Sequence, residues 1–297
     1  MGKSTKNKII MVNSFKGGTG KTSVALSNCV HYCTQCGEYQ NIYFIDIDRL
    51  GTSMSYALFP DDAQLRYFDE YSMQYYDRVC NKVLADEERG TVLHAVLLNP
   101  VASRRQDYDS RGRLWQHPDI SSSIFSSDLL SFMNKCMSLE TNSLFVVDCS
   151  PGLGDMERYL MDAFYGMRQS GSVSEIEELF VTTFDASQIR KTVECLNDAD
   201  DFLHKGERDA SIVLNDIHNW QAISRDYDDH VFDWRKCAED MLKNLKDKNS
   251  VKVRYKKFEP EQVNACMIGY QKKLIDNIYA FVLPLEYREE FYVSSAE

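Results

Sequence analysis

The chain has 297 residues, of which 43% are hydrophobic and 12% aromatic, enough for a large apolar core. Its 34 basic residues face 45 acidic ones, and a net charge of −11 argues against nucleic-acid binding by the chain as a whole. It has no apolar run long enough to cross a membrane and no apolar stretch typical of a secretory signal. Nine cysteines, an odd number, indicate reduced thiols in a cytoplasm.

The first feature along the chain is a glycine-rich segment between an expected strand and an expected helix. Ile9–Val12 is typical of a strand buried on both faces, and residues 23–36 are compatible with a helix. Between the strand and the helix body stand Lys16, Gly17, Gly18, Thr19, Gly20, Lys21, Thr22 and Ser23. Such glycines let backbone N–H groups surround a phosphate, and a helix start adds further N–H donors. The segment predicts a nucleotide site, with Lys21 on the β- and γ-phosphates and the Thr22 hydroxyl on magnesium.

A lysine ahead of the double glycine distinguishes this loop from the common phosphate-binding loop. That pattern requires glycine where the chain has Phe15, and Lys16 follows directly. The string KGGTGKTS resembles the deviant Walker A motif of the ParA/MinD family of ATPases, and is closer to the ParA-type partition ATPases. The resemblance implies an ATP-dependent sandwich dimer in which Lys16 reaches the nucleotide of the other subunit. The alternative is a glycine-rich turn with chance lysines.

Three cysteines in the expected helix have the spacing of an iron–sulfur motif. They are Cys29, Cys33 and Cys36. Cluster ligands need a loop that wraps the metal, whereas a helix packed on a sheet suits small buried side chains. We therefore expect these cysteines to be structural.

A second strand, Asn41–Asp46, ends in acidic residues. Ligands of open α/β sheets bind at the carboxyl ends of the strands. The string FIDIDRLGTSMS resembles the family's second nucleotide motif, with Arg49 and Leu50 in place of its proline and glutamine. The resemblance implies that Asp48 orients the attacking water, with Asp46 as a nearby carboxylate at the metal. The alternative is that both aspartates cap the next helix.

Residues 61–138 have no counterpart in this pattern. We expect an insert that is largely a helical excursion over the sheet, with a strand at Thr91–Leu98. A polar loop after this strand carries Arg104, Arg105, Arg111 and Arg113. These arginines could bind phosphate, DNA or an acidic protein face, or could form a solvated loop with neighbouring aspartates.

The strand Leu144–Val147 ends at Asp148, as in a Walker B motif, whose carboxylate holds magnesium through water. The string VVDCSPGLGD resembles the family's switch region. Gly152 and Gly154 give that segment room to move when the γ-phosphate leaves. As the third element in the family's order, Asp148 supports the nucleotide-site prediction.

Two further strands are expected at 178–183 and 210–214. After the first, Asp185 could cap a helix that runs to about residue 204. After the second, the resemblance implies that Asn215 hydrogen-bonds the adenine, although asparagine also suits a turn. A last strand at 279–283 precedes Pro284, whose surroundings line the adenine pocket in the family.

Residues 218–274 form a second expected insert, with a helix at 231–245 and a strand at 251–258. Alternation places Lys252, Arg254 and Lys256 on one side of this strand. They could contact an anionic partner such as DNA, or protect an edge strand from aggregation. The tail after Pro284 is acidic, which disfavours direct membrane attachment.

The motifs together predict one doubly wound α/β domain over residues 1–297, with a mainly parallel sheet flanked by helices. The resemblance implies Mg²⁺-dependent ATP hydrolysis by a homodimer that switches between ATP and ADP and is stimulated by a protein partner. DNA partitioning in a bacterial cytoplasm, at the nucleoid, is the leading hypothesis. The alternative is a positioning or regulatory ATPase that acts on protein partners without DNA. A metallocluster carrier and a small-molecule kinase on the same scaffold are weaker alternatives.

Overall fold

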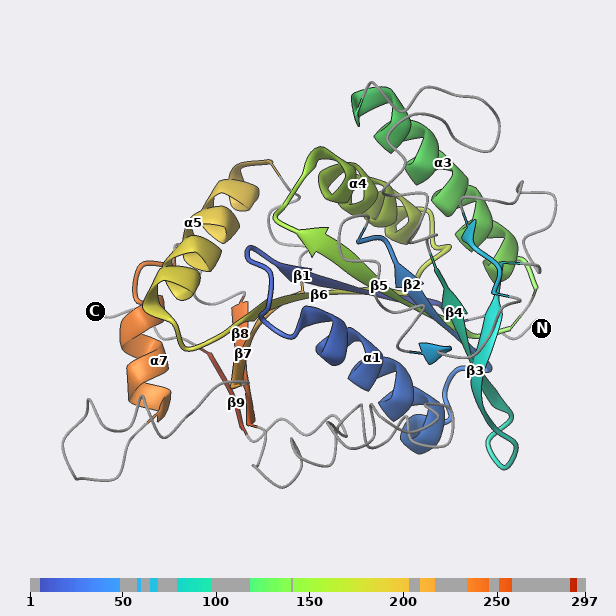
Figure 1. The fold of residues 1–297 in the computed structure, drawn as a ribbon, viewed down its shortest axis with the longest axis horizontal. Coiled ribbons are helices and arrows are strands. Elements are labelled where there is room, and N and C mark those ends of the chain that lie inside the picture. The colour runs from blue at the N-terminus through green and yellow to red at the C-terminus, as the bar shows by residue number, and fades with distance from the viewer. Residues whose placement is uncertain are drawn as a thin grey trace.

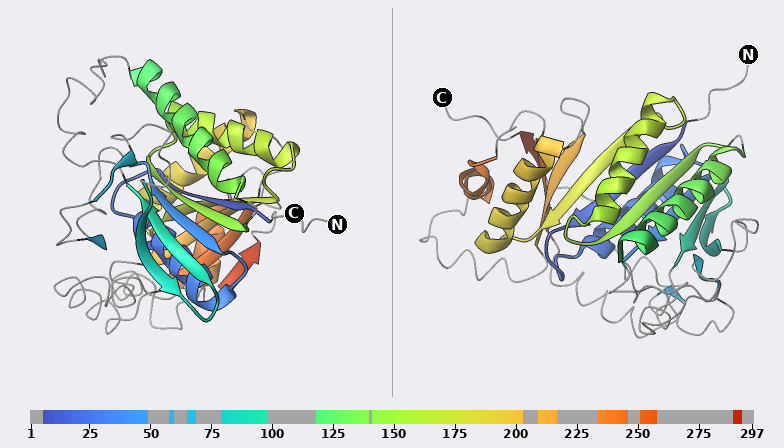
Figure 2. Two further views of the ribbon diagram at one scale, coloured as in Figure 1. Left: turned by 90° about the vertical axis from the view of Figure 1, so that its right-hand side faces the viewer. Right: turned by 90° about the horizontal axis from the view of Figure 1, so that it is seen from above.

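The protein is described here from a computed structural model. The structure describes residues 6–48, 58–59, 65–68, 79–97, 118–139, 141–202, 209–216, 234–245, 251–257 and 289–292. A central sheet lies between helices on its two faces (Figures 1 and 2). The strands are β1 (Lys8–Ser14), β2 (Asn41–Asp46), β3 (Asn81–Asp86), β4 (Thr91–Val96), β5 (Ser143–Pro151), β6 (Glu175–Thr182), β7 (Ala210–Asp216), β8 (Val251–Lys257) and β9 (Glu289–Tyr292). The helices are α1 (Lys21–His31), its π-helical continuation η1 (Tyr32–Cys36), α3 (Pro118–Met137), α4 (Asp155–Gln169), α5 (Ala186–Phe202) and α7 (Trp234–Leu242).

The order of the strands places β1 in the middle of the sheet. Across the sheet the order is β3-β4-β2-β5-β1-β6-β7-β8-β9. Neighbours pair in parallel from β4 to β8, and only the edge strands β3 and β9 are antiparallel to their neighbours. The chain passes from β1 to β2 on one side and later from β5 to β6 across β1. The carboxyl end of β1 therefore lies at the point where the winding reverses, which is where such sheets bind ligands. The predicted doubly wound, mainly parallel sheet is confirmed.

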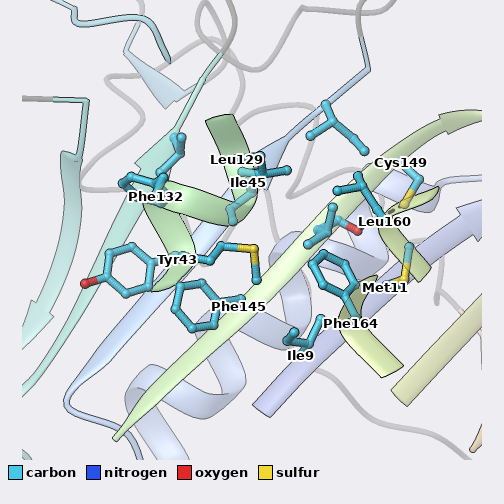
Figure 3. Packing of buried hydrophobic residues seen from close by; sticks show 14 of the residues in the cluster. Ile9, Met11, Tyr43, Ile45, Leu129, Phe132, Phe145, Cys149, Leu160 and Phe164 are labelled. Carbon is cyan, nitrogen blue, oxygen red and sulfur yellow. Dashed lines mark hydrogen bonds between the residues drawn. The ribbon is translucent and has the colours of Figure 1, made fainter. Parts of the chain in front are cut away.

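Alternate residues of the strands pack against different helical layers. Ile9 and Met11 belong to a core with α3 and α4, whereas Ile10 and Val12 belong to a core with α1. Figure 3 shows the first of these cores, in which Tyr43 stacks on Phe145 with ring centroids 5.0 Å apart. A third core joins β6, β7 and β8 to α5 and α7. Strands buried on both faces explain why their sequences are continuous apolar runs.

The structure corrects two expectations for the edges of the sheet. Residues 81–86 are not part of a helical excursion but form β3, which pairs with β4 as a hairpin, and α3 follows as the helical part. β3 is polar and half-exposed because it lies at an edge, so its sequence lacks the apolar run of a central strand. The acidic tail contains β9, which pairs with β8. The expected strand at 279–283, Pro284, the four arginines and most of residues 218–274 lie outside the described residues.

Candidate functional site

The glycine-rich loop connects the end of β1 to the start of α1. Gly18 and Gly20 have φ values of 80° and 81°, a left-handed conformation that favours glycine. Lys16, Gly17 and Gly18 are exposed at the tip of the loop. Phe15 stacks on Phe180 of β6, with ring centroids 5.7 Å apart, and so fixes the loop where it leaves the sheet. A glycine at position 15 would lack this anchor.

The N-terminus of α1 is open to a ligand. Gly20 occupies the N-cap position without a side-chain cap, and the first turn contains no acidic residue. The first-turn amides, those of Lys21, Thr22 and Ser23, have no acceptor within the helix. Free amides and the positive end of the helix dipole favour an anion here. The loop and helix together have the form of a phosphate site.

Two aspartates lie directly beside this helix start. Lys21 Nζ is 2.5 Å from Asp148 Oδ1, and both side chains are buried. Asp46 stands opposite Asp148 in the register of β2 and β5, and it is buried as well. Asp48 is half-buried, and its backbone N–H donates to Asp46 Oδ1 at 3.0 Å. The three predicted carboxylates and Lys21 therefore meet at one end of the sheet.

Burial dominates the electrostatics of this group. It raises the pKa of Asp148, and hydrogen bonds from Lys21 and Thr22 oppose that rise only in part. Burial and the neighbouring Asp148 also raise the pKa of Asp46. Burial alone would lower the pKa of Lys21, but Asp148 raises it overall. Among the described residues, Lys21 is the cation that faces both buried carboxylates, which leaves a negative excess that a further cation would stabilise.

Asn215 is placed at the phosphate loop by the end of β7. Its Nδ2 donates to the Thr19 carbonyl at 2.9 Å, and the residue is fully buried. Asn215 Oδ1 has no hydrogen-bond partner among the described residues. Thr19 also lines a cavity of about 110 Å³ between the loop, β6 and α5. The residue predicted to read the adenine thus supports the loop, and one acceptor remains for a ligand.

The segment after Asp148 is tied to both nucleotide loops. The Gly152 N–H donates to the Ser14 carbonyl at 2.7 Å, and the Ser150 hydroxyl donates to the Ile47 carbonyl at 3.2 Å. Glu157 of α4 accepts a hydrogen bond from the Ser150 N–H at 3.3 Å. Ser150 and Glu157 were not predicted from the sequence. A signal was present for Glu157, because it is the third residue of a helix, where glutamate commonly binds the N-cap amide.

Comparisons with known proteins rest on structure alone. No protein-family model and no curated protein matches the chain. A ParA family ATPase from Chlorobium tepidum superposes with a TM-score of 0.51 at 12% identity, over 93% of this chain and 99% of that one. MinD from Pyrococcus horikoshii gives 0.53 at 14% identity, over 93% and 94% of the two chains. McdA from Cyanothece gives 0.53 at 13% identity, over 94% and 97%.

This chain has the ParA/MinD ATPase fold. The Pyrococcus horikoshii protein is a complex with Mg-ADP and the Cyanothece protein a complex with ATP. The likeness extends over nearly the whole length of each compared chain.

In the basic strand of this ParA/MinD fold, the described basic side chains lie near carboxylates. Arg254 is partly buried and forms an ion pair with Glu177 at 2.6 Å, and Lys252 lies 3.9 Å from Asp209. The side chain of Lys256 lies outside the described residues. The strand itself is confirmed as β8, but the guanidinium of Arg254 faces a carboxylate of β6. This arrangement removes one of the three predicted contacts for an anionic partner.

Two of the three cysteines of α1 and η1 lie in the core. Cys29 and Cys33 are fully buried against the sheet, as expected, whereas Cys36 is partly exposed and its Sγ lies 3.4 Å from His31 Nε2. Across the described ranges, no group of three or more His, Cys, Asp or Glu side chains could hold a metal ion. Nor does any helix within those ranges have the length and apolar character to cross a membrane.

Proposed function

We propose that the protein is a Mg²⁺-dependent ATP hydrolase that works as a nucleotide-switched homodimer. The observation that carries this proposal is the buried Lys21–Asp148 pair beside Asp46, at an uncapped helix start. The loop and helix amides receive the phosphates, and Lys21 exchanges Asp148 for phosphate oxygens. The fold of the ParA/MinD ATPases supports this assignment.

The residues present fit a magnesium ion. The Thr22 hydroxyl and the Asp148 carboxylate supply oxygen donors, which magnesium prefers, and Asp46 adds negative charge behind them. Few protein ligands suffice, because magnesium in nucleotide sites takes most of its ligands from phosphate and water. When bound, the ion neutralises charge on the phosphates. The Thr22 hydroxyl would contact the ion directly, and Asp148 would contact it through water. Asp46 would be a nearby carboxylate at the metal.

Asp48 is assigned to the nucleophilic water and Lys16 to the partner's nucleotide. Asp48 stands on the loop just beyond Asp46, half-exposed at the mouth of the site. There its carboxylate can accept a proton from a water and hold it in line with the γ-phosphate. Lys16 is exposed at the tip of the loop, as a residue that acts across an interface must be.

The dimer is tested by Lys16→Ala, with Lys191→Ala as the matched control. Lys191 is an exposed lysine that lines the cavity beside the loop. We expect Lys16→Ala to bind ATP with nearly unchanged affinity and to lose dimer-dependent hydrolysis, while Lys191→Ala retains both. Equal turnover in wild type and Lys16→Ala would contradict the role of the second lysine.

For the task of the switch we propose DNA partitioning at the nucleoid in a bacterial cytoplasm, with a protein partner that stimulates hydrolysis. The test is binding of Asp48→Ala protein to random-sequence duplex DNA at low salt, with ATP and with ADP. The substitution is expected to trap the ATP dimer. Binding with ATP alone that weakens steeply with salt supports partitioning.

A second candidate is a positioning or regulatory ATPase that acts on protein partners without DNA. The ion pair between Arg254 and Glu177 and the net charge of −11 favour it. If the trapped dimer, confirmed by light scattering, binds no DNA in either nucleotide state, this candidate replaces partitioning.

A further inference from the structure

A buried carboxylate in the first turn of α4 lies outside the residues assigned above. Glu157 is 3% exposed. α4 begins at Asp155, after Gly154 in an extended conformation that provides no side-chain cap. A carboxylate desolvated in this way costs stability unless it makes good hydrogen bonds. The buried carboxylate of Glu157 therefore depends on the hydrogen bonds that it makes.

Both ends of the segment 150–154 are held by Glu157. Its Oε1 accepts the Ser150 N–H at 3.3 Å, and its Oε2 lies against Gly154. The N–H of Glu157 itself, the Ser150 hydroxyl and the Gly154 N–H also favour the charged carboxylate. Burial raises the pKa of Glu157, and these hydrogen bonds oppose the rise. A Cβ atom on Gly154 would lie 2.8 Å from Glu157 Oε2. The carboxylate thus occupies space that only glycine leaves open.

The same segment is bonded to the two loops that carry the nucleotide residues. The Ser150 hydroxyl donates to the Ile47 carbonyl, one residue before Asp48. The Gly152 N–H donates to the Ser14 carbonyl, at the end of β1 before the phosphate loop. A displacement of the segment would therefore move both loops, and small displacements of aligned groups reduce rates strongly.

We propose that Glu157 is a positioning residue for hydrolysis, because its carboxylate holds segment 150–154 where it aligns the loop of Asp48 with the phosphate loop. The inference rests on the proposed ATPase function and adds a residue to it. Glu157 touches neither nucleotide nor metal in this assignment. It acts through Ser150 and Gly154, so its loss should reduce turnover while nucleotide affinity remains.

Two variants test this inference in different ways. Glu157→Gln replaces one acceptor oxygen with a donor that faces N–H groups. Gly154→Ala retains the carboxylate but displaces it, and its φ of −78° gives alanine no backbone strain. The controls are Asp162→Asn, the same change of charge on the exposed side of α4, and Gly166→Ala, where a Cβ atom meets nothing within 4 Å.

The readouts are amide hydrogen exchange in residues 150–154 of the nucleotide-free protein, the Kd for Mg-ATP, and kcat. For both test variants we expect exchange to rise about 10-fold and kcat to fall about 10-fold or more, with Kd within about 3-fold. The controls should stay within about 2-fold of wild type in all three. The double variant should lose no more than the larger single loss, because both changes break one contact.

Unchanged exchange in both variants would overturn the inference while leaving the proposed function intact. Faster exchange with wild-type kcat would limit Glu157 to a structural cap and would overturn its positioning role. A parallel loss of kcat and Mg-ATP affinity would also overturn it. A wild-type protein that hydrolyses no ATP would overturn the proposed function itself, and the exchange experiment would still show whether Glu157 holds the segment.

Discussion

The two ends of β1 each lie beside a group of charged side chains that is wholly or partly buried, and the two groups differ in their balance of charge. At the start of β1, Lys8 pairs with Glu175 at 2.6 Å and with Glu177 at 3.0 Å, and Arg254 pairs with Glu177 at 2.6 Å. Two cations face two carboxylates there. After the end of β1, Lys21 is the one cation that faces Asp148 and Asp46 within the described part of the chain.

The pKa values of the carboxylates shift in opposite directions at the two ends because the balance of charge differs. Although burial alone would raise the pKa of Glu177, Lys8 and Arg254 lower it below its ordinary value. Burial raises the pKa of both Asp46 and Asp148, and Lys21 compensates only in part. Residue types at the two ends are alike, so burial of charge by itself does not mark a site. The uncompensated group does, because its negative excess is stabilised by a further cation.

The largest effect is expected at the balanced end. Glu177→Ala leaves the buried Lys8 and the partly buried Arg254 without this carboxylate, and breaking a buried pair on one side costs about 3–5 kcal/mol of unfolding free energy. Urea unfolding measures it. The control is Glu38→Ala, which breaks the half-exposed Lys6–Glu38 pair and should cost less than about 1 kcal/mol. A loss below 1 kcal/mol for Glu177→Ala would mean that this end is not held by its charges.

At the site end the loss should fall on activity instead. Asp148→Asn removes the carboxylate that we assign to magnesium, and we expect kcat for ATP to fall about 100-fold. Unfolding free energy should change by less than about 1 kcal/mol, because Lys21 still faces Asp46 and the negative excess is smaller. Hydrolysis and urea unfolding on the same preparation decide this. A stability loss as large as that of Glu177→Ala would make Lys21–Asp148 a structural pair and would remove the contrast between the two ends.

Acid titration should separate the ends in a third way. The folded pKa of Glu177 lies below its ordinary value of 4.5, so its stabilisation is present above that pH and is lost as the pH falls through the folded pKa. Asp148 changes the unfolding free energy in the opposite direction as the pH falls. Because its pKa is raised, the folded state binds a proton at a higher pH than the unfolded state does. The acid loss is at most about 1.4 kcal/mol per pH unit for one group. Urea midpoints of wild type and Glu177→Gln between about pH 3 and 6 measure it, and identical pH profiles would contradict it.

The sequence predicts the site end far better than the balanced end. Lys21 and Asp148 are 127 residues apart, yet each belongs to a recognisable motif at or just after the end of an apolar strand, so their meeting follows from strand order. Glu177 and Arg254 are 77 residues apart and belong to no motif. Alternation along β8 places Arg254 on one face but does not reveal which side chain lies opposite. Strand β4 was predicted, but its hairpin partner β3 and the edge strand β9 were missed for a related reason, since edge strands lack the continuous apolar run of central ones.

The smallest predicted effect concerns Asn215, whose amide donates to the phosphate loop and leaves Oδ1 without a partner in the described part of the chain. Asn215→Ala removes a buried hydrogen bond, which is about 1 kcal/mol or 5-fold in affinity. If Oδ1 accepts a hydrogen bond from the amino group of adenine, the substitution weakens ATP binding more than GTP binding. This is the result we expect. Guanine carries an oxygen at that position, which cannot donate a hydrogen bond to Oδ1. Equal loss for both nucleotides would restrict Asn215 to loop support.

The control is Asn28→Ala. This substitution removes a buried amide donor that lies 2.9 Å from the Val24 carbonyl of α1, the same distance as in the Asn215 hydrogen bond. It should leave the ratio of ATP to GTP affinity unchanged.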